Sequence, residues 1–365
     1  MLKTEEILVN MGPQHPSTHG VFRCVLRLNG EKVTQAENHM GYLHRGVEKI
    51  AETRTYGQFI PYTDRLDYVA AMLNEWAYVV SVEKLMNLEV PARAEFLRVI
   101  MGELQRIASH LIYIGSMALD LGAFTGWMYC FRDREKVVDL FELASGTRLT
   151  HNYFRIGGVN EDIPENFGPA LEAFINYFPQ GLEEYHNFIY GNEVFQLRTK
   201  GIGVITKDMA LAHGITGPNL RASGIDLDLR RDLTYSVYDQ LSFQVPTRTA
   251  GDSFARLELR FEEMVQSISL VKQAWERLSE GPITAKVPKI IKPPAGEAFV
   301  PIEGAKGFLG YYVVSDGSAK PYRIHIHSPS LVNLDIFPQI AQGSYIQDTV
   351  VSLASIDIVL GEVDR

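Results

Sequence analysis

An unbroken apolar stripe between residues 252 and 279 constrains the fold of this chain more than any other feature. Its members recur at alternating spacings of three and four residues: Phe254, Leu257, Phe261, Met264, Ile268, Val271, Trp275 and Leu278. Such a stripe predicts an amphipathic helix that packs against a neighbouring helix, and no ligand is needed to explain it. Asp252 or Ser253 can cap the start of this helix, and Gly281-Pro282 ends it. The sequence therefore predicts a helical bundle.

Other segments predict further helices and a smaller share of strands. The helical candidates, taken from apolar periodicity and a first-turn proline, are residues 64–88 and 91–121, with weaker patterns over 133–149 and 169–189. The extended candidates are residues 7–35, with a hairpin turn at Asn29-Gly30, and residues 310–314 and 323–327.

These patterns predict an α+β fold that is mainly α. We expect a small β-rich region over residues 1–55, a central helical bundle over 56–285, and an extended C-terminal α/β region over 286–365 that packs back on the bundle.

Composition excludes several classes of protein. The net charge of −9 argues against nucleic acid as a partner. Cys24 and Cys130 are too few for a four-cysteine zinc site or an iron–sulfur cluster, and they fit a reducing compartment. The first residues carry no secretion signal, and the longest apolar run, residues 111–119, falls short of the roughly 18 residues that span a bilayer. The chain is expected to be soluble, or peripheral to a membrane that a partner spans.

The first candidate for chemistry is a loop that holds two histidines. His15 and His19 are four residues apart, but Pro16 and Gly20 favour a loop over the helix on which such a pair binds zinc. The imidazoles can bond backbone groups, or one of them can act as a proton donor near its ordinary pKa of about 6.5. Spacing alone leaves both interpretations open.

Three further residues stand out singly. Arg45 is a permanent cation, suited either to an anionic cluster or phosphate or to a surface ion pair with Glu48. Tyr68 lies on the predicted helix over residues 64–88, where most tyrosines are core residues. Asp120 interrupts the most apolar run, so a buried carboxylate there needs a donor partner such as a histidine; otherwise it is a plain helix-terminal residue.

Two weaker patterns complete the set. His325 and His327 share one face of the predicted strand. They could bind a metal together, or they could lie on a solvated edge of the sheet. Gly201 and Gly203 lack the third glycine of a dinucleotide fingerprint, so no nicotinamide site is predicted in this chain.

Several ordered motifs resemble the 49 kDa subunit family of respiratory complex I. They are Gly-Pro-Gln-His-Pro-Ser-Thr-His-Gly at 12–20, Gly-Tyr-Leu-His-Arg-Gly-Val-Glu-Lys at 41–49, and the segments 118–123, 214–224, 322–330 and 361–365. That family is similar to the large subunit of nickel–iron hydrogenases, so the resemblance implies a hydrogenase-large-subunit-like fold.

The resemblance also excludes a hydrogenase metal centre. Those enzymes hold nickel with two pairs of cysteines. At the corresponding places this chain has no cysteine within residues 65–70 or 355–359. Nickel needs thiolates there, so we expect this chain to hold no metal.

The resemblance implies that a quinone binds in the pocket that holds the metals in hydrogenases. Tyr68 and His19 match positions whose side chains contact the quinone headgroup, and Asp120 matches the carboxylate that pairs with His19. His15 belongs to the same loop and is a further candidate for binding. Tyr68 would donate a hydrogen bond to one carbonyl oxygen of the headgroup, and His19 would address the other.

Two more positions are implied near a partner's iron–sulfur cluster. Arg45 matches a cation beside the terminal 4Fe-4S cluster. Many relatives carry a histidine close to that cluster, and Thr150 stands at its position here, with His151 one residue later. Whether His151 takes the role of that histidine is left open, since on a helix one residue turns a side chain by about 100°.

The resemblance implies the quinone-reducing, peripheral-arm subunit of a proton-translocating NADH-quinone oxidoreductase. Its partners would be a cluster-bearing small subunit, a 30 kDa-like subunit, a ferredoxin-like subunit, a membrane-embedded quinone-channel subunit and the membrane surface. NAD and the 4Fe-4S cluster would be bound only by partners. The expected location is the cytoplasmic side of a bacterial cell membrane. The electron donor and the quinone type stay open.

Two other classes of function compete with this interpretation. One is a metal hydrolase that uses His15, His19 and the pair His325 and His327. The other is a structural scaffold without a ligand site.

Overall fold

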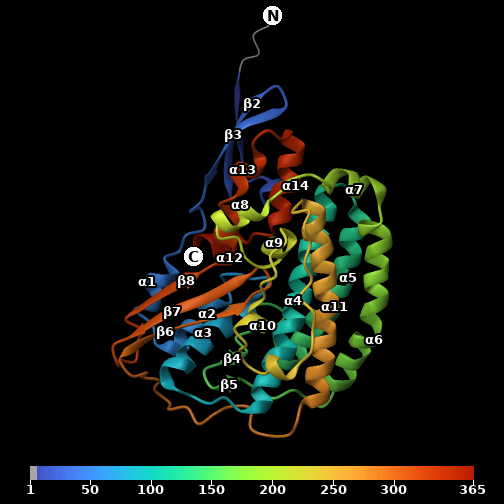
Figure 1. Ribbon diagram of the computed structural model, residues 1–365. Helices are drawn as coiled ribbons and strands as arrows, with labels where there is room; N and C mark the ends of the chain where they lie inside the picture. Colours follow the sequence, from blue (N-terminus) through green and yellow to red (C-terminus); the bar gives the residue numbers. More distant parts are fainter. Residues whose placement is uncertain (1–5) are drawn as a thin grey trace, which may run out of the picture.

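The structure, a computed structural model, describes residues 6–365. The long helices of its bundle are α4 (Ala92–Asp120), α5 (Phe124–Ser145), α6 (Phe167–Tyr185) and α11 (Ser253–Arg277). Helix α4 packs against both α5 and α11, and these helices run side by side in Figure 1. The helix predicted from the apolar stripe is confirmed as α11, and Asp252 Oδ1 accepts the Ala255 N–H at 2.8 Å as its cap.

The helix predicted over residues 64–88 is wrong at its start. Helix α3 spans Ala71–Met86, and residues 64–70 form a turn. A separate short helix, α2 (Tyr56–Thr63), precedes that turn. Tyr68, which the sequence pattern places on a helix, therefore lies in a turn.

Two aspartate side chains of the turn over residues 64–70 bind backbone N–H groups. Asp64 Oδ2 accepts the backbone N–H of Asn152 at 3.0 Å. Asp67 Oδ1 accepts the backbone N–H of Val69 at 3.2 Å, two residues along the chain. The local bond of Asp67 competes with helical hydrogen bonds, and apolar periodicity does not register it.

Two other boundaries differ from the prediction. Helix α5 begins well before residue 133 and ends before Gly146, whose φ of 72° lies in the left-handed region that ends helices. Helix α6 begins two residues before the predicted residue 169 and continues into a π-helical turn, η2 (His186–Tyr190).

Two antiparallel three-stranded sheets flank the bundle. The first has the order β1-β2-β3 and comprises Ile7–Met11, Arg23–Asn29 and Lys32–His39. Its β2–β3 hairpin closes where Asn29 pairs with Lys32, as the Asn-Gly turn predicts. The second has the order β6-β7-β8 and comprises Gly296–Glu303, Phe308–Ser315 and Arg323–His327. Strand β6 is missed by the sequence patterns, whereas β8 has the predicted bounds.

Short elements connect these layers. They are η1 (Pro16–Thr18), α1 (Val47–Ala51), β4 (Phe154–Arg155), β5 (Gly158–Val159), α7 (Glu193–Thr199), α8 (Lys207–Ala212), α9 (Gly217–Ala222), α10 (Leu229–Asp232), η3 (Tyr238–Gln240), α12 (Pro329–Leu334), α13 (Phe337–Ala341), α14 (Ile346–Ile356) and α15 (Leu360–Asp364). The result is mainly α with small sheets, which confirms the predicted fold class.

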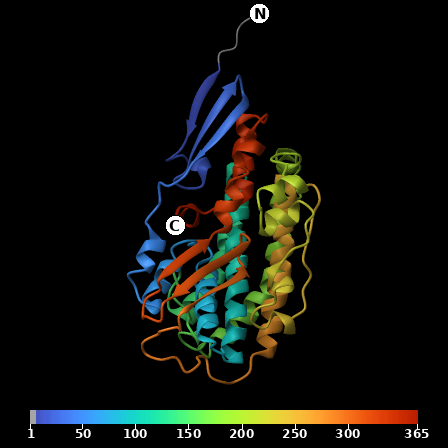
Figure 2. The same cartoon turned by 60° about the vertical axis from the view of Figure 1, so that its left-hand side comes forward.

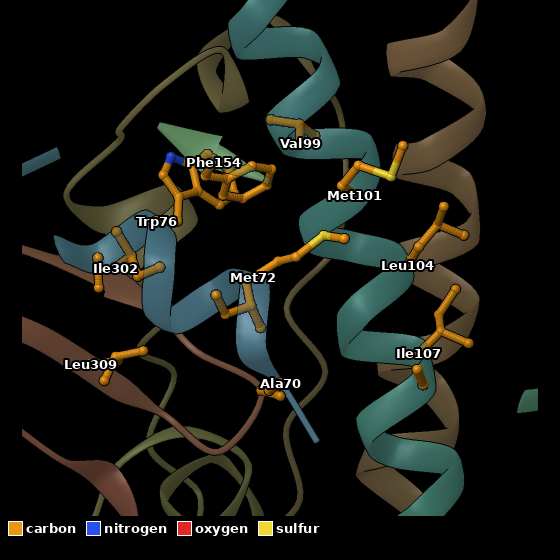
Figure 3. Close-up of a cluster of buried hydrophobic side chains, with 14 of the residues drawn as sticks. Ala70, Met72, Trp76, Val99, Met101, Leu104, Ile107, Phe154, Ile302 and Leu309 are labelled. Atoms are coloured by element: carbon orange, nitrogen blue, oxygen red, sulfur yellow. The ribbon is translucent and has the colours of Figure 1, made fainter. Parts of the chain in front are cut away.

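The larger core lies between α3, α4, α11 and the sheet β6–β8. Figure 3 shows part of it, with Met72 and Trp76 from α3, Leu104 from α4 and Ile302 from β6. Trp76 packs edge-on against Phe154 of β4, with ring centroids 5.7 Å apart. This core fixes α3, and with it the turn that carries Tyr68.

A second core joins the N-terminal sheet to the end of the chain. It contains Phe22, Cys24 and Leu26 from the sheet region and Phe337 and Leu353 from α13 and α14. The N-terminal sheet projects beyond one end of the bundle, beside α13 and α14 (Figures 1 and 2). The C-terminal residues therefore contribute to both cores, and the division at residues 55 and 285 stays a prediction.

A buried network of charged side chains joins α4 to α11. Its members are Glu103, Arg106, His110, Arg221, Asp228, Arg230, Glu263 and Glu303. Arg221 is central, because its guanidinium lies 2.6 Å from Glu263 and 2.7 Å from Glu303. Ion pairs at this depth are favourable only while both partners are present.

We expect Arg221→Met to lower the free energy of unfolding by about 3–5 kcal/mol, because it leaves two buried carboxylates without their cation. Arg231, an exposed arginine paired with Asp226 and Asp232, provides the matched control Arg231→Met, with an expected loss of at most about 1 kcal/mol. Denaturant unfolding of the two variants measures both values. Equal losses in the two variants would contradict a structural role for the network.

Candidate functional site

A cavity of about 130 Å³ opens where the ends of several elements meet. Its polar lining residues are His19, Tyr68, Tyr113, Ser116 and Asp357. Its apolar lining residues are Val69, Ile112, Leu353, Ala354, Ile358 and Val359. The structure thus brings together His19 and Tyr68, which lie in separate loops of the N-terminal half, with the segment before the C-terminus.

The loop that carries His19 is held by its own residues. His15 begins the η1 turn, and its Nδ1 accepts the Ser17 N–H at 3.2 Å. The fully buried Thr18 hydroxyl lies 2.7 Å from His15 O and 2.8 Å from Gly20 O. His19 has a φ of 53°, so its side chain leaves the loop from a left-handed backbone position. The loop is therefore ordered, and His15 serves as its cap.

His19 contacts the carboxylate at the end of α4. Its Nε2 lies 2.7 Å from Asp120 Oδ2, and both side chains are mostly buried, at 19% and 15% exposure. This is the pair that the sequence implied, and it joins residues more than one hundred positions apart. A hydrogen bond to a carboxylate is among the stronger side-chain interactions, so it orients the imidazole at the edge of the cavity.

Tyr68 reaches the cavity from the turn before α3. Its side chain is 39% exposed, and its hydroxyl has no hydrogen-bond partner within residues 6–365. Burial, with the nearby Asp67 carboxylate, raises the pKa of this phenol above its ordinary value. A neutral phenol with a free hydroxyl is a hydrogen-bond donor available to a ligand.

The turn under Tyr68 is fixed by a buried ion pair. Lys306 Nζ lies 2.9 Å from Asp67 Oδ2 and donates to Ser109 Oγ at 3.0 Å. On the opposite side the chain end packs closely, since a Cβ on Gly361 would lie 2.7 Å from Leu66 O and 3.5 Å from the Tyr68 ring. Only glycine fits this approach. No sequence pattern singled out Lys306.

The far wall of the cavity is built around Asp357. This residue has a φ of 62°, and its Oδ2 lies 3.3 Å from Arg260 Nε. The Arg260 guanidinium stacks over the Tyr113 ring at 4.1 Å. No local sequence pattern identifies Tyr113 or Arg260 as part of the site.

The donor set suits a flat molecule with two carbonyl oxygens. A phenol and an imidazole provide two hydrogen-bond donors, while aliphatic side chains cover the remaining walls. Within residues 6–365 no three His, Cys, Asp or Glu side chains are grouped as a metal site. The hydrolase interpretation is therefore wrong, since His15, His19, His325 and His327 do not gather at one centre.

The C-terminal histidines are engaged elsewhere. His325 Nδ1 lies 3.1 Å from Glu48 Oε1, and His327 Nδ1 lies 3.2 Å from Phe308 O. Glu48 also pairs with Arg323 at 3.3 Å. The alternative that paired Glu48 with Arg45 is consequently wrong.

Arg45 and His151 lie outside the cavity lining but are linked to the Tyr68 turn. Arg45 is exposed and donates from Nη2 to Arg65 O at 3.0 Å. Next to Arg65, Asp64 holds the N–H of Asn152, the residue that follows His151. Arg45 therefore binds the 64–70 turn directly, and His151 is next to a residue that does.

His151 is buried and neutral. Its Nδ1 lies 3.2 Å from Thr147 O, and its ring meets Phe141 with centroids 4.8 Å apart. Burial lowers the pKa of this imidazole from 6.5 to about 4, only partly offset by the bond to Thr147. His151 lies in a loop. The offset of one residue from the family's histidine therefore does not turn its side chain by the angle expected on a helix.

None of the helices in the described part of the chain has the length and apolarity to cross a membrane.

Comparison with known proteins places this chain among the subunits of a respiratory oxidoreductase. A family model described as the 49 kDa subunit of respiratory-chain NADH dehydrogenase matches residues 120–365. That range contains Asp120 and the whole C-terminal wall of the cavity.

Curated relatives match over nearly the full chain. The NADH-quinone oxidoreductase D subunit of Clostridium beijerinckii is 60% identical over 364 residues, covering 100% of this chain and 98% of the relative. The proteins of the same name from Desulforamulus reducens and Geobacillus kaustophilus are 55% and 49% identical, covering 100% of this chain and 99% and 100% of themselves. The chain belongs to the 49 kDa subunit family of respiratory-chain NADH dehydrogenase.

The low pKa of His151 predicts an acid-dependent loss of stability. The unfolded imidazole takes up a proton near pH 6.5, whereas the folded one resists protonation until about pH 4. The contribution of His151 to the free energy of unfolding is therefore fully present above pH 6.5. It falls by roughly 3 kcal/mol as the pH drops to about 4. The difference in unfolding free energy between wild type and His151→Gln should change with pH over that interval. A pH-independent difference would contradict the neutral, buried state.

The contact between His19 and Asp120 predicts local order in the loop. Asp120→Asn keeps the shape of the side chain but removes its charge, so we expect the amides of residues 15–20 to exchange about tenfold faster, equivalent to about 1.4 kcal/mol. Hydrogen-exchange mass spectrometry of that peptide measures the change. Asp139→Asn, at an exposed carboxylate of α5, is the control and should leave the peptide's exchange as in wild type. Unchanged exchange in Asp120→Asn would refute the anchoring role.

Proposed function

We propose that this chain is the quinone-reducing subunit of the peripheral arm of a proton-translocating NADH-quinone oxidoreductase. One observation carries the proposal: the Tyr68 phenol and the His19 imidazole, the latter held by Asp120, line the same largely apolar cavity. Two donors at one cavity suit the two carbonyl oxygens of a quinone head. The proposal also agrees with the name of the curated relatives.

Quinone reduction needs two electrons and two protons. Electrons would come from the 4Fe-4S cluster of a small partner subunit, since the cysteines of this chain, Cys24 and Cys130, are both buried and single. Tyr68 and His19 would each hold a hydrogen bond to one carbonyl oxygen and supply a proton as negative charge develops there. His15 would act by capping the loop that carries His19.

Proton loss from His19 would change its attraction to Asp120. An ion pair between imidazolium and carboxylate becomes a weaker neutral contact, and the low polarity of the cavity enlarges the difference. The loop over residues 12–20 could then shift relative to α4. We take this local change of charge as the first step of coupling to proton translocation.

The assembly follows from the same proposal. The cluster-bearing subunit would lie against the 64–70 turn, where Arg45 and His151 are attached, and Arg45 would act as a cation near the cluster. A 30 kDa-like subunit and a ferredoxin-like subunit would complete the arm, and NAD would be bound by other chains. A membrane-embedded partner would admit the apolar quinone tail from the cytoplasmic side of a bacterial cell membrane.

Tyr68→Phe and His19→Ala test the site. In membranes that contain the assembled complex, each variant should reduce quinone at least about tenfold more slowly, since each loses a hydrogen bond worth about 1.5–3 kcal/mol to a charged group in the transition state. Electron transfer from the donor to a hydrophilic artificial acceptor should stay as in wild type. Tyr42→Phe, at an exposed tyrosine outside the cavity lining, is the matched control. Unimpaired quinone reduction in both cavity variants would refute the proposal.

A further inference from the structure

Arg256 is a fully buried cation whose hydrogen-bond partners are all neutral. It lies in the first turns of α11, with no exposed surface. Its Nη2 donates to Ser355 Oγ at 2.7 Å and to Gly203 O at 2.7 Å, and its Nη1 donates to Gly251 O at 2.8 Å. Its Nε also lies 3.1 Å from Ser355 Oγ. Within residues 6–365 no carboxylate pairs with this guanidinium.

The titratable groups that face Arg256 do not neutralise it. They are Tyr113, Arg260 and Asp252. Arg260 is itself a cation, and Tyr113 is a neutral phenol whose pKa is raised by burial. The Asp252 carboxylate is used at the start of the helix, where it accepts the N–H groups of Ala255 and Gly201 at 2.8 Å each. The Arg256 pKa falls to about 10 through burial, so the side chain is still charged at neutral pH.

Among residues 6–365, the other cations beside the cavity lining each have a counter-charge. The ion pairs are Arg260 with Asp357, Lys306 with Asp67, and His19 with Asp120 when the imidazole is protonated. Glu362 lies behind the Tyr68 turn and accepts a hydrogen bond from Ser330. Burial, with the nearby Asp67, raises the pKa of Glu362 to about 8, so it is largely neutral. One positive charge, that of Arg256, is left over.

This charge lies directly behind the cavity wall. Ser355, which Arg256 binds, follows Ala354 and comes two residues before Asp357, and both neighbours line the cavity. Tyr113, another lining residue, donates from its hydroxyl to Ser355 O at 3.4 Å. No polar solvent separates the guanidinium from this wall, because both Arg256 and Ser355 are fully buried. An electrostatic interaction is therefore weakly screened here.

A buried charge without a partner costs stability, so its presence beside a cavity calls for a compensating role. We propose that Arg256 stabilises the negative charge that a quinone head acquires in this cavity. The inference rests on the proposed function. In that step the head takes one electron from the iron–sulfur cluster of the partner, no bond breaks, and the negative charge spreads over the quinone oxygens. A second electron and two protons complete the quinol, while Arg256 keeps all its protons and acts through space.

Ser355 provides a matched pair of variants that differ by one charge. Ser355→Asp places a carboxylate against the guanidinium and neutralises it, whereas Ser355→Asn has nearly the same shape without the charge. We compare the rates at which the assembled complex in membranes reduces a low-potential and a high-potential quinone analogue. In Ser355→Asp the ratio of low-potential to high-potential rate should fall about tenfold, equivalent to about 59 mV for one electron. In Ser355→Asn the ratio should equal that of wild type.

Variants of Arg256 itself supply an independent comparison. Arg256→Lys keeps the charge but loses the planar fork, and Arg256→Met loses both. If the charge acts as proposed, the rate ratio falls in Arg256→Met and is retained in Arg256→Lys, whatever the two variants lose in absolute rate. A purely structural role would lower both variants alike and leave both ratios unchanged.

The outcomes separate this inference from the proposed function. Equal rate ratios in Ser355→Asp and Ser355→Asn, or in Arg256→Lys and Arg256→Met, would overturn the role of Arg256. A photoreactive quinone analogue that labels the Tyr68 turn in these variants would show that the site itself still binds quinone. Absence of such labelling in the wild-type complex would instead refute the proposed function.

Discussion

The packing of α4 against α11 across a buried seam of charged side chains is the constraint on which the site depends. α4 ends at Asp120 and supplies Ile112, Tyr113 and Ser116 to the cavity lining, while α11 places its arginines behind the opposite wall. A network of ion pairs such as that of Arg221 and Glu263 is satisfied in one register of the two helices, in addition to the register that close apolar packing favours. The seam therefore determines which side chains of the two helices face the cavity.

Two cations from distant parts of the chain hold the residues that line the cavity. The segments 65–70 and 355–359 contain no cysteine, and they provide a tyrosine in a turn and an aspartate with a left-handed backbone. Each is held by a cation from a distant part of the chain: Lys306 fixes the Asp67 turn beneath Tyr68, and Arg260 lies against Asp357. These contacts determine where a phenol and a carboxylate stand relative to an apolar wall.

Buried charges are paired differently in the seam between α4 and α11 and around the cavity. In the seam between α4 and α11, carboxylates and guanidinium groups alternate and hydrogen-bond one another, which offsets the cost of their burial. Around the cavity the balance is less complete, with a glutamic acid that holds its proton and an arginine whose hydrogen-bond acceptors are all neutral. Both groups lie beside the cavity, where the proposed electron transfer would change the charge.

Local sequence patterns determined those elements that form from neighbouring residues alone. The apolar stripe specified α11, the Asn29-Gly30 turn specified the hairpin, and the carboxylate of Asp120 in an apolar run signalled that some partner was required. Tertiary structure decided the rest. Tyr68 lies in a turn whose Asp67 is paired with Lys306, a residue far along the chain, and Arg256 meets Ser355 only after α14 has packed on α11. Periodicity and capping act over a few residues, whereas which distant groups share a buried, weakly screened space is set by the packing of the whole chain.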